Sequence, residues 1–247
     1  MKLTVKIVLV ETSHPGNIGA AARAMKNMGL NDLVLVKPEC FPDEAATARA
    51  SGAHDILENA KITDNLEDAI SDCNLVIAAS ARSRNINWPT YDPRECVNKI
   101  IKESHLGCCA VVFGPEQSGL KNEHIDLCHG LLYVPVNPNF SSLNLSMAVQ
   151  IFCYELRMAL VNSDFKEKSD SVPLASVSEM ENFYQHLEKM LIKNDFLDPK
   201  KPRFLMRRIR KLFAKAAPDN NEINILRGIL TSFEKKDLEK NEQIYRR

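Results

Sequence analysis

Short apolar stretches, each followed by a turn and a segment with helical character, constrain the fold of this chain most strongly. Residues 5–10 are apolar at nearly every position, which is typical of a parallel strand buried on both faces. Similar stretches lie at residues 33–36, 75–79, 109–113 and 131–134. Strands that alternate with helices predict an α/β fold, in which helices flank a parallel sheet on both sides.

The intervening segments and the C-terminal third carry helical patterns. Helices are expected after Asn17 and over residues 44–52, 66–73, 93–104, 122–128, 143–161, 176–194, 203–216 and 222–240, with short extended segments at 53–57 and 60–63. Residues 163–172 are polar and aperiodic, which predicts a linker. We therefore expect one α/β domain at residues 1–162, this linker, and a small all-α domain at residues 173–247.

The composition is that of an ordinary globular protein, with 45% hydrophobic and 26% charged residues. No apolar run approaches the length of a membrane span, and the N-terminus lacks an apolar signal region, so a cytoplasmic protein without a membrane partner is expected. The seven cysteines form neither a CxxC pair nor a regular framework. They are expected to be reduced and mostly buried, and no metal is expected.

Charge is unevenly distributed along a chain whose net charge is zero. Residues 1–162 hold 14 basic and 18 acidic side chains, and the remainder holds 18 and 14. The basic excess is concentrated at residues 200–215, where no acidic residue occurs. A local basic patch predicts a polyanionic partner. The candidate residues for binding this polyanion are Arg207, Arg208, Arg210 and Lys211. A solvated helix face is the alternative.

Ligands of parallel α/β sheets bind beyond the carboxyl ends of the strands. The turns after Val10, Ala79, Phe113 and Val134 are therefore the candidate site. Residues 134–150 stand out among them, because two prolines and two potential capping serines precede an apolar helix. Exposed N–H groups at such a bend can hold an anionic ligand, although an ordinary capped helix fits the same residues.

Several common enzyme classes lack their motifs here. The chain has no GxxxxGK[ST] and no GxGxxG after the first strand, which weakens the nucleotide triphosphatase and dehydrogenase interpretations. It has neither GxSxG nor HExxH, so hydrolase chemistry has no visible carrier.

Three segments together resemble a known family. Residues 17–23, NIGAAAR, are similar to the first motif of SPOUT-class (TrmH/SpoU superfamily) RNA 2′-O-ribose methyltransferases, N-x-G-x-x-x-R. Residues 113–120, FGPEQSGL, resemble the second motif, and residues 141–146, SSLNLS, the third. The segments VETSHPGN, SARSR and NILRGIL also look like the TrmJ branch of this class, which methylates the ribose of the pyrimidine at position 32 in the tRNA anticodon loop.

The resemblance implies an S-adenosyl-L-methionine-dependent enzyme that releases S-adenosyl-L-homocysteine, acts on tRNA as a homodimer, and ends its sheet in a C-terminal trefoil knot. The implied cofactor-binding residues are Ala79, Ser80, Ala81, Gly114, Val134, Ser141, Ser142 and Leu143. The implied catalytic residues are Arg23, Ser142, Asn144, Asn17 and Glu116. Arg23 is expected to orient the ribose hydroxyl or its phosphate, and Arg82 and Arg84 to meet RNA phosphates with it.

Structural roles compete with these assignments. Asn17, Ser142 and Asn144 would also serve as helix caps, and Glu116 as a carboxylate at a helix start. Pro115 stands where some members of the class carry arginine, which removes one possible phosphate or cofactor contact. Two other functions remain open: methylation of rRNA or of another tRNA position, and RNA binding without catalysis.

Overall fold

The computed structural model describes residues 4–80, 88–104, 106–162 and 173–245. Its strands form one seven-stranded sheet in the order β3-β2-β1-β6-β4-β7-β5, and every pairing is parallel. The strands are β1 Val5–Val10, β2 Asp32–Val36, β3 Lys61–Thr63, β4 Cys73–Ala79, β5 Thr90–Tyr91, β6 Cys108–Phe113 and β7 Gly130–Leu132. The predicted α/β fold with a parallel sheet is thus confirmed.

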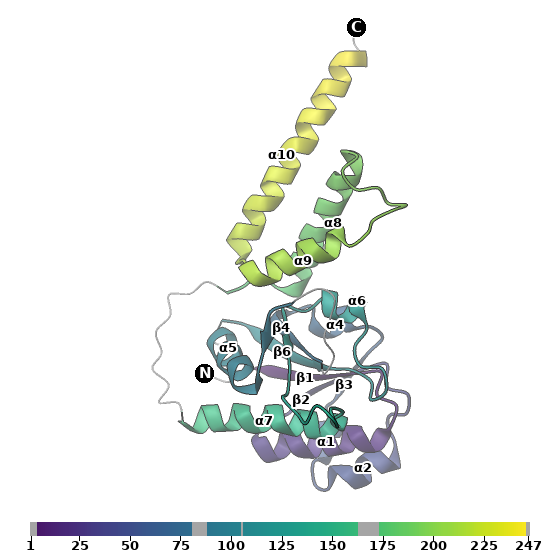
Figure 1. The fold of residues 1–247 in the computed structure, drawn as a ribbon, viewed down its shortest axis with the longest axis vertical. Coiled ribbons are helices and arrows are strands. Elements are labelled where there is room, and N and C mark those ends of the chain that lie inside the picture. The colour runs from purple at the N-terminus through teal and green to yellow at the C-terminus, as the bar shows by residue number, and fades with distance from the viewer. Residues whose placement is uncertain (1–3, 81–87, 105, 163–172, 246–247) are drawn as a thin grey trace.

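Helices cover both faces of this sheet (Figure 1). They are α1 Pro15–Met28, α2 Glu44–Ala50, α3 His54–Glu58, α4 Leu66–Ile70, α5 Pro93–Ser104, α6 Asn122–Asp126, α7 Leu145–Asn162, α8 Val177–Lys193, α9 Leu205–Ala216 and α10 Asn220–Tyr245. Helices α1, α3, α5 and α7 pack on one face, and α2 lies outside α1. Helices α4 and α6 cover the other face.

Alternation along β1 shows how the sequence creates two cores. Ile7 and Leu9 point into the cluster under α1 and α7, whereas Val8 and Val10 point into the cluster under α4 and α6. All four side chains are buried, as expected for a central parallel strand. The nearly continuous apolar run therefore reflects burial on both faces.

Two local predictions differ from the structure. Residues 53–57 were expected to be extended, but α3 occupies most of this segment and buries Ile56 and Leu57 against the sheet. The short run of apolar residues cannot distinguish a buried strand from a single helical turn. Strand β5 was not predicted, because two residues carry no periodicity.

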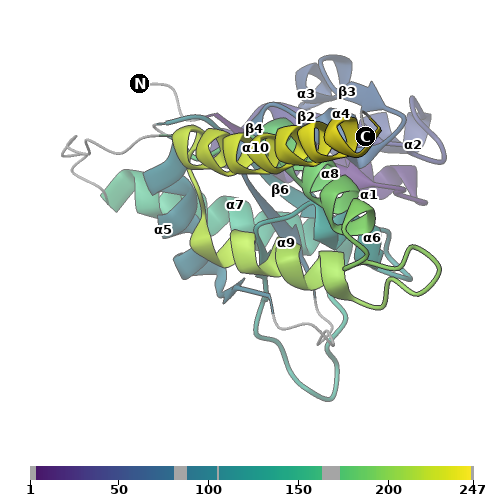
Figure 2. The ribbon, with the colours of Figure 1, turned by 90° about the horizontal axis from the view of Figure 1, so that it is seen from above.

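Helices α8, α9 and α10 lie together beside the α/β part (Figures 1 and 2). Their own hydrophobic cluster contains Phe183, Tyr184 and Ile223. This bundle rests on the α4/α6 side of the sheet. The Asn74 side chain donates to the Leu174 carbonyl at 2.6 Å, and Val177 is buried in the sheet cluster itself. The predicted linker at residues 163–172 lies outside the described residues.

Cysteines in the described part of the chain are reduced and mostly buried, as predicted; Cys40 is exposed and Cys108 partly so. Within the described ranges, no helix has the combination of length and apolar character that crossing a bilayer requires.

Candidate cofactor pocket and active site

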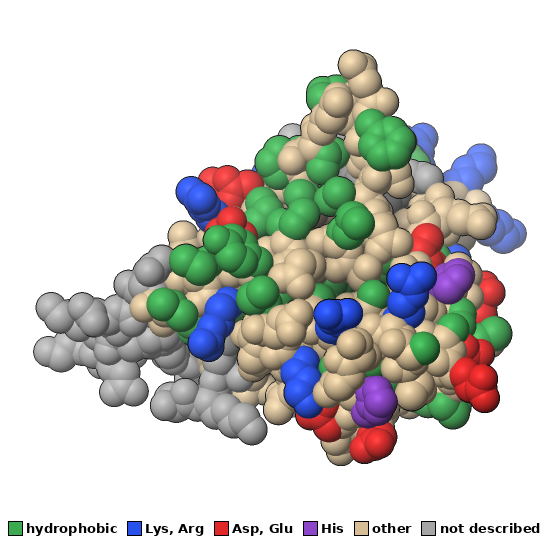
Figure 3. All heavy atoms as spheres, turned by 90° about the horizontal axis from the view of Figure 1, so that it is seen from below, with side chains coloured by type: hydrophobic (Ala, Val, Ile, Leu, Met, Phe, Trp, Pro, Cys, Tyr) green, Lys and Arg blue, Asp and Glu red, His purple; other side chains and the backbone are tan. Residues whose placement is uncertain are grey.

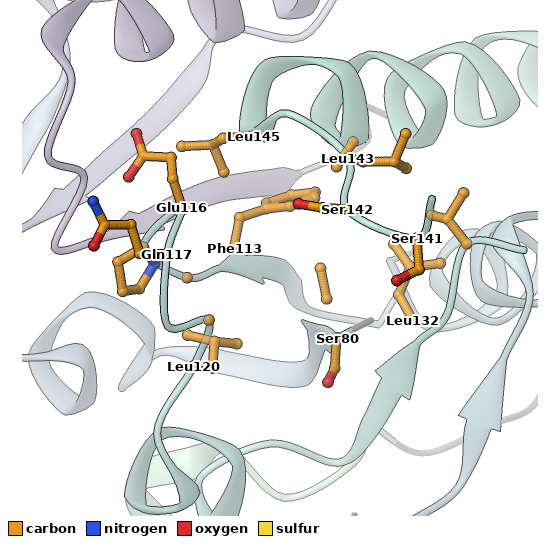
Figure 4. Close-up of a pocket in the computed structure, with 16 residues that line it drawn as sticks. Ser80, Phe113, Glu116, Gln117, Leu120, Leu132, Ser141, Ser142, Leu143 and Leu145 are labelled. Carbon is orange, nitrogen blue, oxygen red and sulfur yellow. The ribbon is translucent and has the colours of Figure 1, made fainter. Parts of the chain in front are cut away.

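The carboxyl ends of β4, β6 and β7 and the segment before α7 enclose a pocket of about 440 Å³ (Figure 4). Its lining residues are Ala79, Ser80, Phe113, Gly114, Pro115, Glu116, Gln117, Gly119, Leu120, Leu132, Val134, Ser141, Ser142, Leu143, Leu145 and Ala148. The volume lies within the range of roughly 300–1,000 Å³ that is usual for small-molecule sites. The pocket is thus at the predicted edge of the sheet and large enough for a small-molecule ligand.

Most of the residues predicted to bind the cofactor meet in this pocket. Those that line it are Ala79, Ser80, Gly114, Val134, Ser141, Ser142 and Leu143, whereas Ala81 lies outside the described residues. Small side chains on the β4 and β6 turns allow a ligand to approach the backbone closely. Phe113, Leu120, Leu132 and Leu145 were not predicted as ligand contacts and supply apolar walls. The second motif contains Phe113 and Leu120, so the sequence offered a signal for those two.

Three predicted catalytic residues form one hydrogen-bonded chain beside the pocket. The Asn17 Nδ2 donates to Glu116 Oε1 at 2.6 Å, and the Asn144 Nδ2 donates to Asn17 Oδ1 at 3.0 Å. The Ser13 hydroxyl also donates to Glu116, at 3.0 Å from Oε2. These hydrogen bonds join the start of α1, the loop after β6 and the segment before α7. The three residues, one from each of the three motifs, therefore fix these segments relative to one another.

The helix caps differ from those predicted. Helix α1 begins at Pro15, and His14 caps it by accepting from the Gly16 N–H, so the alternative that Asn17 caps this helix is wrong. Proline suits a first helical position because its missing N–H would have no partner there. Asn17 consequently lies inside the helix, where its side chain is available to Glu116.

Helix α7 begins at Leu145, so Ser141 and Ser142 do not start or cap it, contrary to the prediction. Asn144 takes the capping role, since its Oδ1 accepts from the Ser146 N–H at 2.9 Å. Asn144 also donates to Asn17 through its Nδ2, so it caps α7 and belongs to the hydrogen-bonded chain at the same time. The two serines remain free of the helix and line the pocket.

The pKa of the Glu116 carboxyl is lowered. Partial burial opposes ionisation, but hydrogen bonds from the Asn17 side chain and from Ser13 outweigh it. Because the folded-state pKa lies below the unfolded value, the ionised carboxylate stabilises the fold above the usual glutamate range. This contribution is lost as the pH falls through the lowered pKa. Glu116 therefore holds the site together as an anion at neutral pH.

Replacing this anion tests the hydrogen-bonded chain. For the methyl transfer that the resemblance implies, we expect Glu116→Gln to lower the rate by roughly tenfold or more, since hydrogen bonds to a charged group contribute about 1.5–3 kcal/mol each. Initial rates with excess cofactor and tRNA measure the effect. Glu123→Gln is the matched control, because Glu123 is an exposed carboxylate on α6. Equal rates for the two variants would show that the Glu116 charge does not organise the site.

Arg23 lies in a neighbouring hollow rather than in the cofactor pocket. The hollow runs between α1 and α7 and is lined by Ala20, Arg23, Ala24, Asn27, Leu143, Ser146, Met147, Gln150 and Ile151. Leu143 lines both cavities, so it forms a shared wall between them. The Arg23 side chain is exposed. Its guanidinium is thus available to a macromolecular ligand that enters this hollow.

Two of the four arginine and lysine residues predicted to bind RNA on α9 are engaged within the protein. Arg207 Nε donates to Asp126 Oδ1 at 2.8 Å. Arg210 pairs with Glu181 and lies over the Tyr184 ring, 4.4 Å from its centroid. These contacts join α9 to α6 and α8, which sequence periodicity cannot indicate. Arg208 is exposed and Lys211 half-buried. Arg82 and Arg84 lie outside the described residues.

Known proteins resemble this chain in sequence and fold. Residues 4–154 match the SpoU rRNA Methylase family, and residues 178–243 match the C-terminal domain of the tRNA methyltransferase TrmJ. The chain is 50% identical over 241 residues to the tRNA (cytidine/uridine/adenosine-2′-O-)-methyltransferase TrmJ of Pseudomonas aeruginosa, covering 94% of each chain. It is 46% identical to the tRNA (cytidine/uridine-2′-O-)-methyltransferase TrmJ of Cronobacter sakazakii, covering 97% of this chain and 100% of the relative.

A solved structure extends the likeness to both halves of the molecule. The crystal structure of TrmJ from Z. mobilis ZM4 superimposes with a TM-score of 0.83 at 36% identity, covering 94% of this chain and 99% of the other. The chain therefore belongs to the SpoU methylase family of SPOUT-type proteins. Its C-terminal residues and its nearly full-length relatives place it in the TrmJ branch of that family.

Proposed function

We propose that this protein is an S-adenosyl-L-methionine-dependent tRNA 2′-O-ribose methyltransferase that acts on the pyrimidine at position 32 of the anticodon loop. The observation that carries the proposal is the series of hydrogen bonds from Asn144 through Asn17 to Glu116. These bonds connect all three motifs beside a pocket of suitable size. The TrmJ relatives are named as tRNA 2′-O-methyltransferases that act on cytidine and uridine, which supports the reaction and the class of substrate.

The pocket residues fit a sulfonium methyl donor. Phe113, Leu120 and Val134 provide apolar surface for a purine ring, and the small Ala79 and Gly114 allow hydrogen bonds from backbone groups. When bound, S-adenosyl-L-methionine supplies a methyl group already activated for transfer. Ser141 and Ser142 offer exposed hydroxyls at the other wall. We therefore assign the binding of the adenosine and methionine parts to the turns that follow β4, β6 and β7.

Arg23 is assigned to the substrate rather than to the methyl donor. A guanidinium remains protonated at neutral pH, so it serves poorly as a base and well as an anchor for a phosphate. Placed in the hollow that shares Leu143 with the pocket, Arg23 would bind the RNA backbone and orient the 2′-hydroxyl. Positioning of this kind is sufficient for large rate enhancements when the methyl group is already reactive.

We propose tRNA binding for residues 173–247 and methyl transfer for residues 1–162, joined by a linker at residues 163–172. Arg208 and Lys211 remain candidates for phosphate contacts, while Arg207 and Arg210 hold α9 in place. Arg82 and Arg84, beside the cofactor turn in sequence, complete the proposed RNA-binding set. A tRNA-modifying role implies a cytoplasmic location. The trefoil knot of the SPOUT class belongs to the same proposal.

A homodimer is supported by the outer face of α7. Met147, Tyr154 and Val161 recur every seven residues and are 61%, 49% and 62% exposed. Figure 3 shows hydrophobic side chains gathered on this side of the molecule. The stripe formed by these three side chains adjoins the Arg23 hollow, because Met147 also lines that hollow. Large exposed apolar patches mark protein interfaces. We propose that two copies meet here, so that each active site forms beside the partner subunit.

Charge on this stripe should separate the subunits. We expect the double variant Met147→Glu, Tyr154→Glu to sediment as a monomer and to lose methylation, because carboxylates would be desolvated at the interface. Analytical ultracentrifugation measures the assembly. The control is Ile229→Glu, which changes an apolar side chain that is 45% exposed on α10. A variant that stays dimeric would place the interface elsewhere.

Modification mapping decides the proposed function. The protein is incubated with labelled S-adenosyl-L-methionine and unmodified tRNA, and the product nucleosides and their positions are identified by mass spectrometry. A 2′-O-methyl group at position 32 is expected. Methylation at another position or of rRNA would change the assigned substrate, and binding of tRNA without any product would favour a non-catalytic role.

A further inference from the structure

Two thiols face each other at the amino ends of β4 and β6. The proposed cofactor pocket lies at the opposite, carboxyl ends of the same strands. Cys73 and Cys108 are register partners on these neighbouring strands, and their Sγ atoms are 3.3 Å apart. Cys73 is fully buried, whereas Cys108 is partly exposed. A disulfide between them requires the sulfurs to approach from this distance to about 2.0 Å. The pair plays no part in the proposed methyl transfer.

A buried lysine accompanies these thiols. Lys6 on β1 is 6% exposed, and its Nζ donates to Asp72 Oδ1 at 2.6 Å. The pKa of Cys108 is lowered, mainly by its hydrogen bond with the Cys73 thiol and then by the nearby charge of Lys6. Burial, Asp72 and Asp32 oppose this shift but do not cancel it. The same bond and burial raise the pKa of Cys73. The accessible sulfur is therefore the one favoured as a thiolate, which is the nucleophilic form.

We propose that Cys108 and Cys73 form a reversible oxidation site that reacts with hydroperoxides. The Cys108 thiolate attacks the peroxide: an S–O bond forms, the O–O bond breaks, and the second oxygen leaves as water or an alcohol after taking up a proton. The Cys73 sulfur then attacks the resulting sulfenic acid. An S–S bond forms, the S–O bond breaks, and the hydroxyl leaves as water with the Cys73 proton. The two thiols lose two electrons in total, and the peroxide gains them.

Metal binding is the competing use of this cluster. Asp72, Cys73 and Cys108 bring a carboxylate oxygen and two sulfurs within 4.8 Å of one another, a donor set that suits zinc. However, Lys6 Nζ already bonds the carboxylate and adds a positive charge beside the sulfurs. An adjacent ammonium repels a metal cation and stabilises a thiolate. The cluster is therefore better suited to oxidation.

Mass spectrometry of the folded, full-length protein tests the site. After treatment with a slight excess of hydrogen peroxide, the intact protein should lose the mass of two hydrogen atoms, and peptide mapping should identify a Cys73–Cys108 cross-link. Dithiothreitol should restore the original mass. In Cys73→Ser, dimedone should instead trap a sulfenic acid at Cys108, because the resolving thiol is missing. Cys108→Ser should show neither product.

Two further variants separate this chemistry from general oxidation. Cys40→Ser removes an exposed thiol and should leave the cross-link intact. Lys6→Met should slow alkylation of Cys108 by iodoacetamide near neutral pH and shift its pH dependence upward. The proposal is overturned if peroxide links other cysteines or leaves the pair reduced while Cys40 reacts. It is also overturned if stoichiometric zinc binds and protects both thiols.

Discussion

Arg23→Ala is expected to lose methyl transfer while retaining its methyl donor. Because Arg23 lies in the hollow between α1 and α7 and not among the residues that line the cofactor pocket, S-adenosyl-L-methionine should bind with unchanged affinity. The turnover number should fall by about 100-fold or more, as is typical when a group that orients or stabilises the reacting atoms is removed. Single-turnover methylation and cofactor titration by calorimetry measure the two effects separately.

Two variants sharpen this experiment. Lys26→Ala removes another exposed cation from α1 and should leave turnover nearly unchanged, so it controls for general loss of charge. Arg23→Lys retains the charge but loses the forked donors, and an intermediate rate is expected if a phosphate is gripped through two hydrogen bonds. A normal turnover number for Arg23→Ala would contradict its assignment to the ribose or phosphate.

Gly114→Ala should abolish tight cofactor binding. A Cβ at this position would lie 2.4 Å from the Leu120 backbone nitrogen, a distance that real side chains do not tolerate. Both residues line the pocket, so relief of the clash must move the loop after β6. A displacement of about 1 Å in such a site can cost on the order of 100-fold in activity. A comparable loss of affinity for S-adenosyl-L-methionine is expected by calorimetry.

The matched control for this variant is Gly228→Ala. A Cβ at Gly228, in α10, meets no atom within 4 Å, so cofactor affinity should be unaffected. Thermal melting monitors whether Gly114→Ala remains folded. If it melts like the wild type and binds the cofactor normally, the loop does not form the binding wall.

Sequence patterns predicted the elements of the α/β half because a strand that is buried on both faces has a nearly continuous run of apolar residues. The run at residues 5–10 was predicted as an internal strand and forms β1, and α5 was predicted with its observed bounds, Pro93–Ser104. The same patterns failed where one residue has alternative partners. Asn17 is suitable as a cap, yet its actual partner is Glu116, 99 positions away. No local signal specifies that choice.

The predicted pocket residues came from the family resemblance, and their meeting around one cavity depends on the parallel order of β6, β4 and β7. The role of the basic helix was harder to predict. A cluster of positive charge does not reveal which members are neutralised by acids from other elements. Asp126 and Glu181 lie far from α9 in sequence, so their pairing with Arg207 and Arg210 appears only in the structure.

The burial of Val177 in the sheet cluster has a consequence for how such proteins diversify. The first residue of α8 packs in the cluster that contains Val8 and Ala69, and Ala214 of α9 packs against the same cluster. The helical half is consequently not a module that could be transplanted onto any related sheet. A recipient sheet would need a matching surface on its α4 and α6 side, including a carboxylate at the position that corresponds to Asp126. Recombination between relatives should therefore succeed only when both sides of this junction are inherited together.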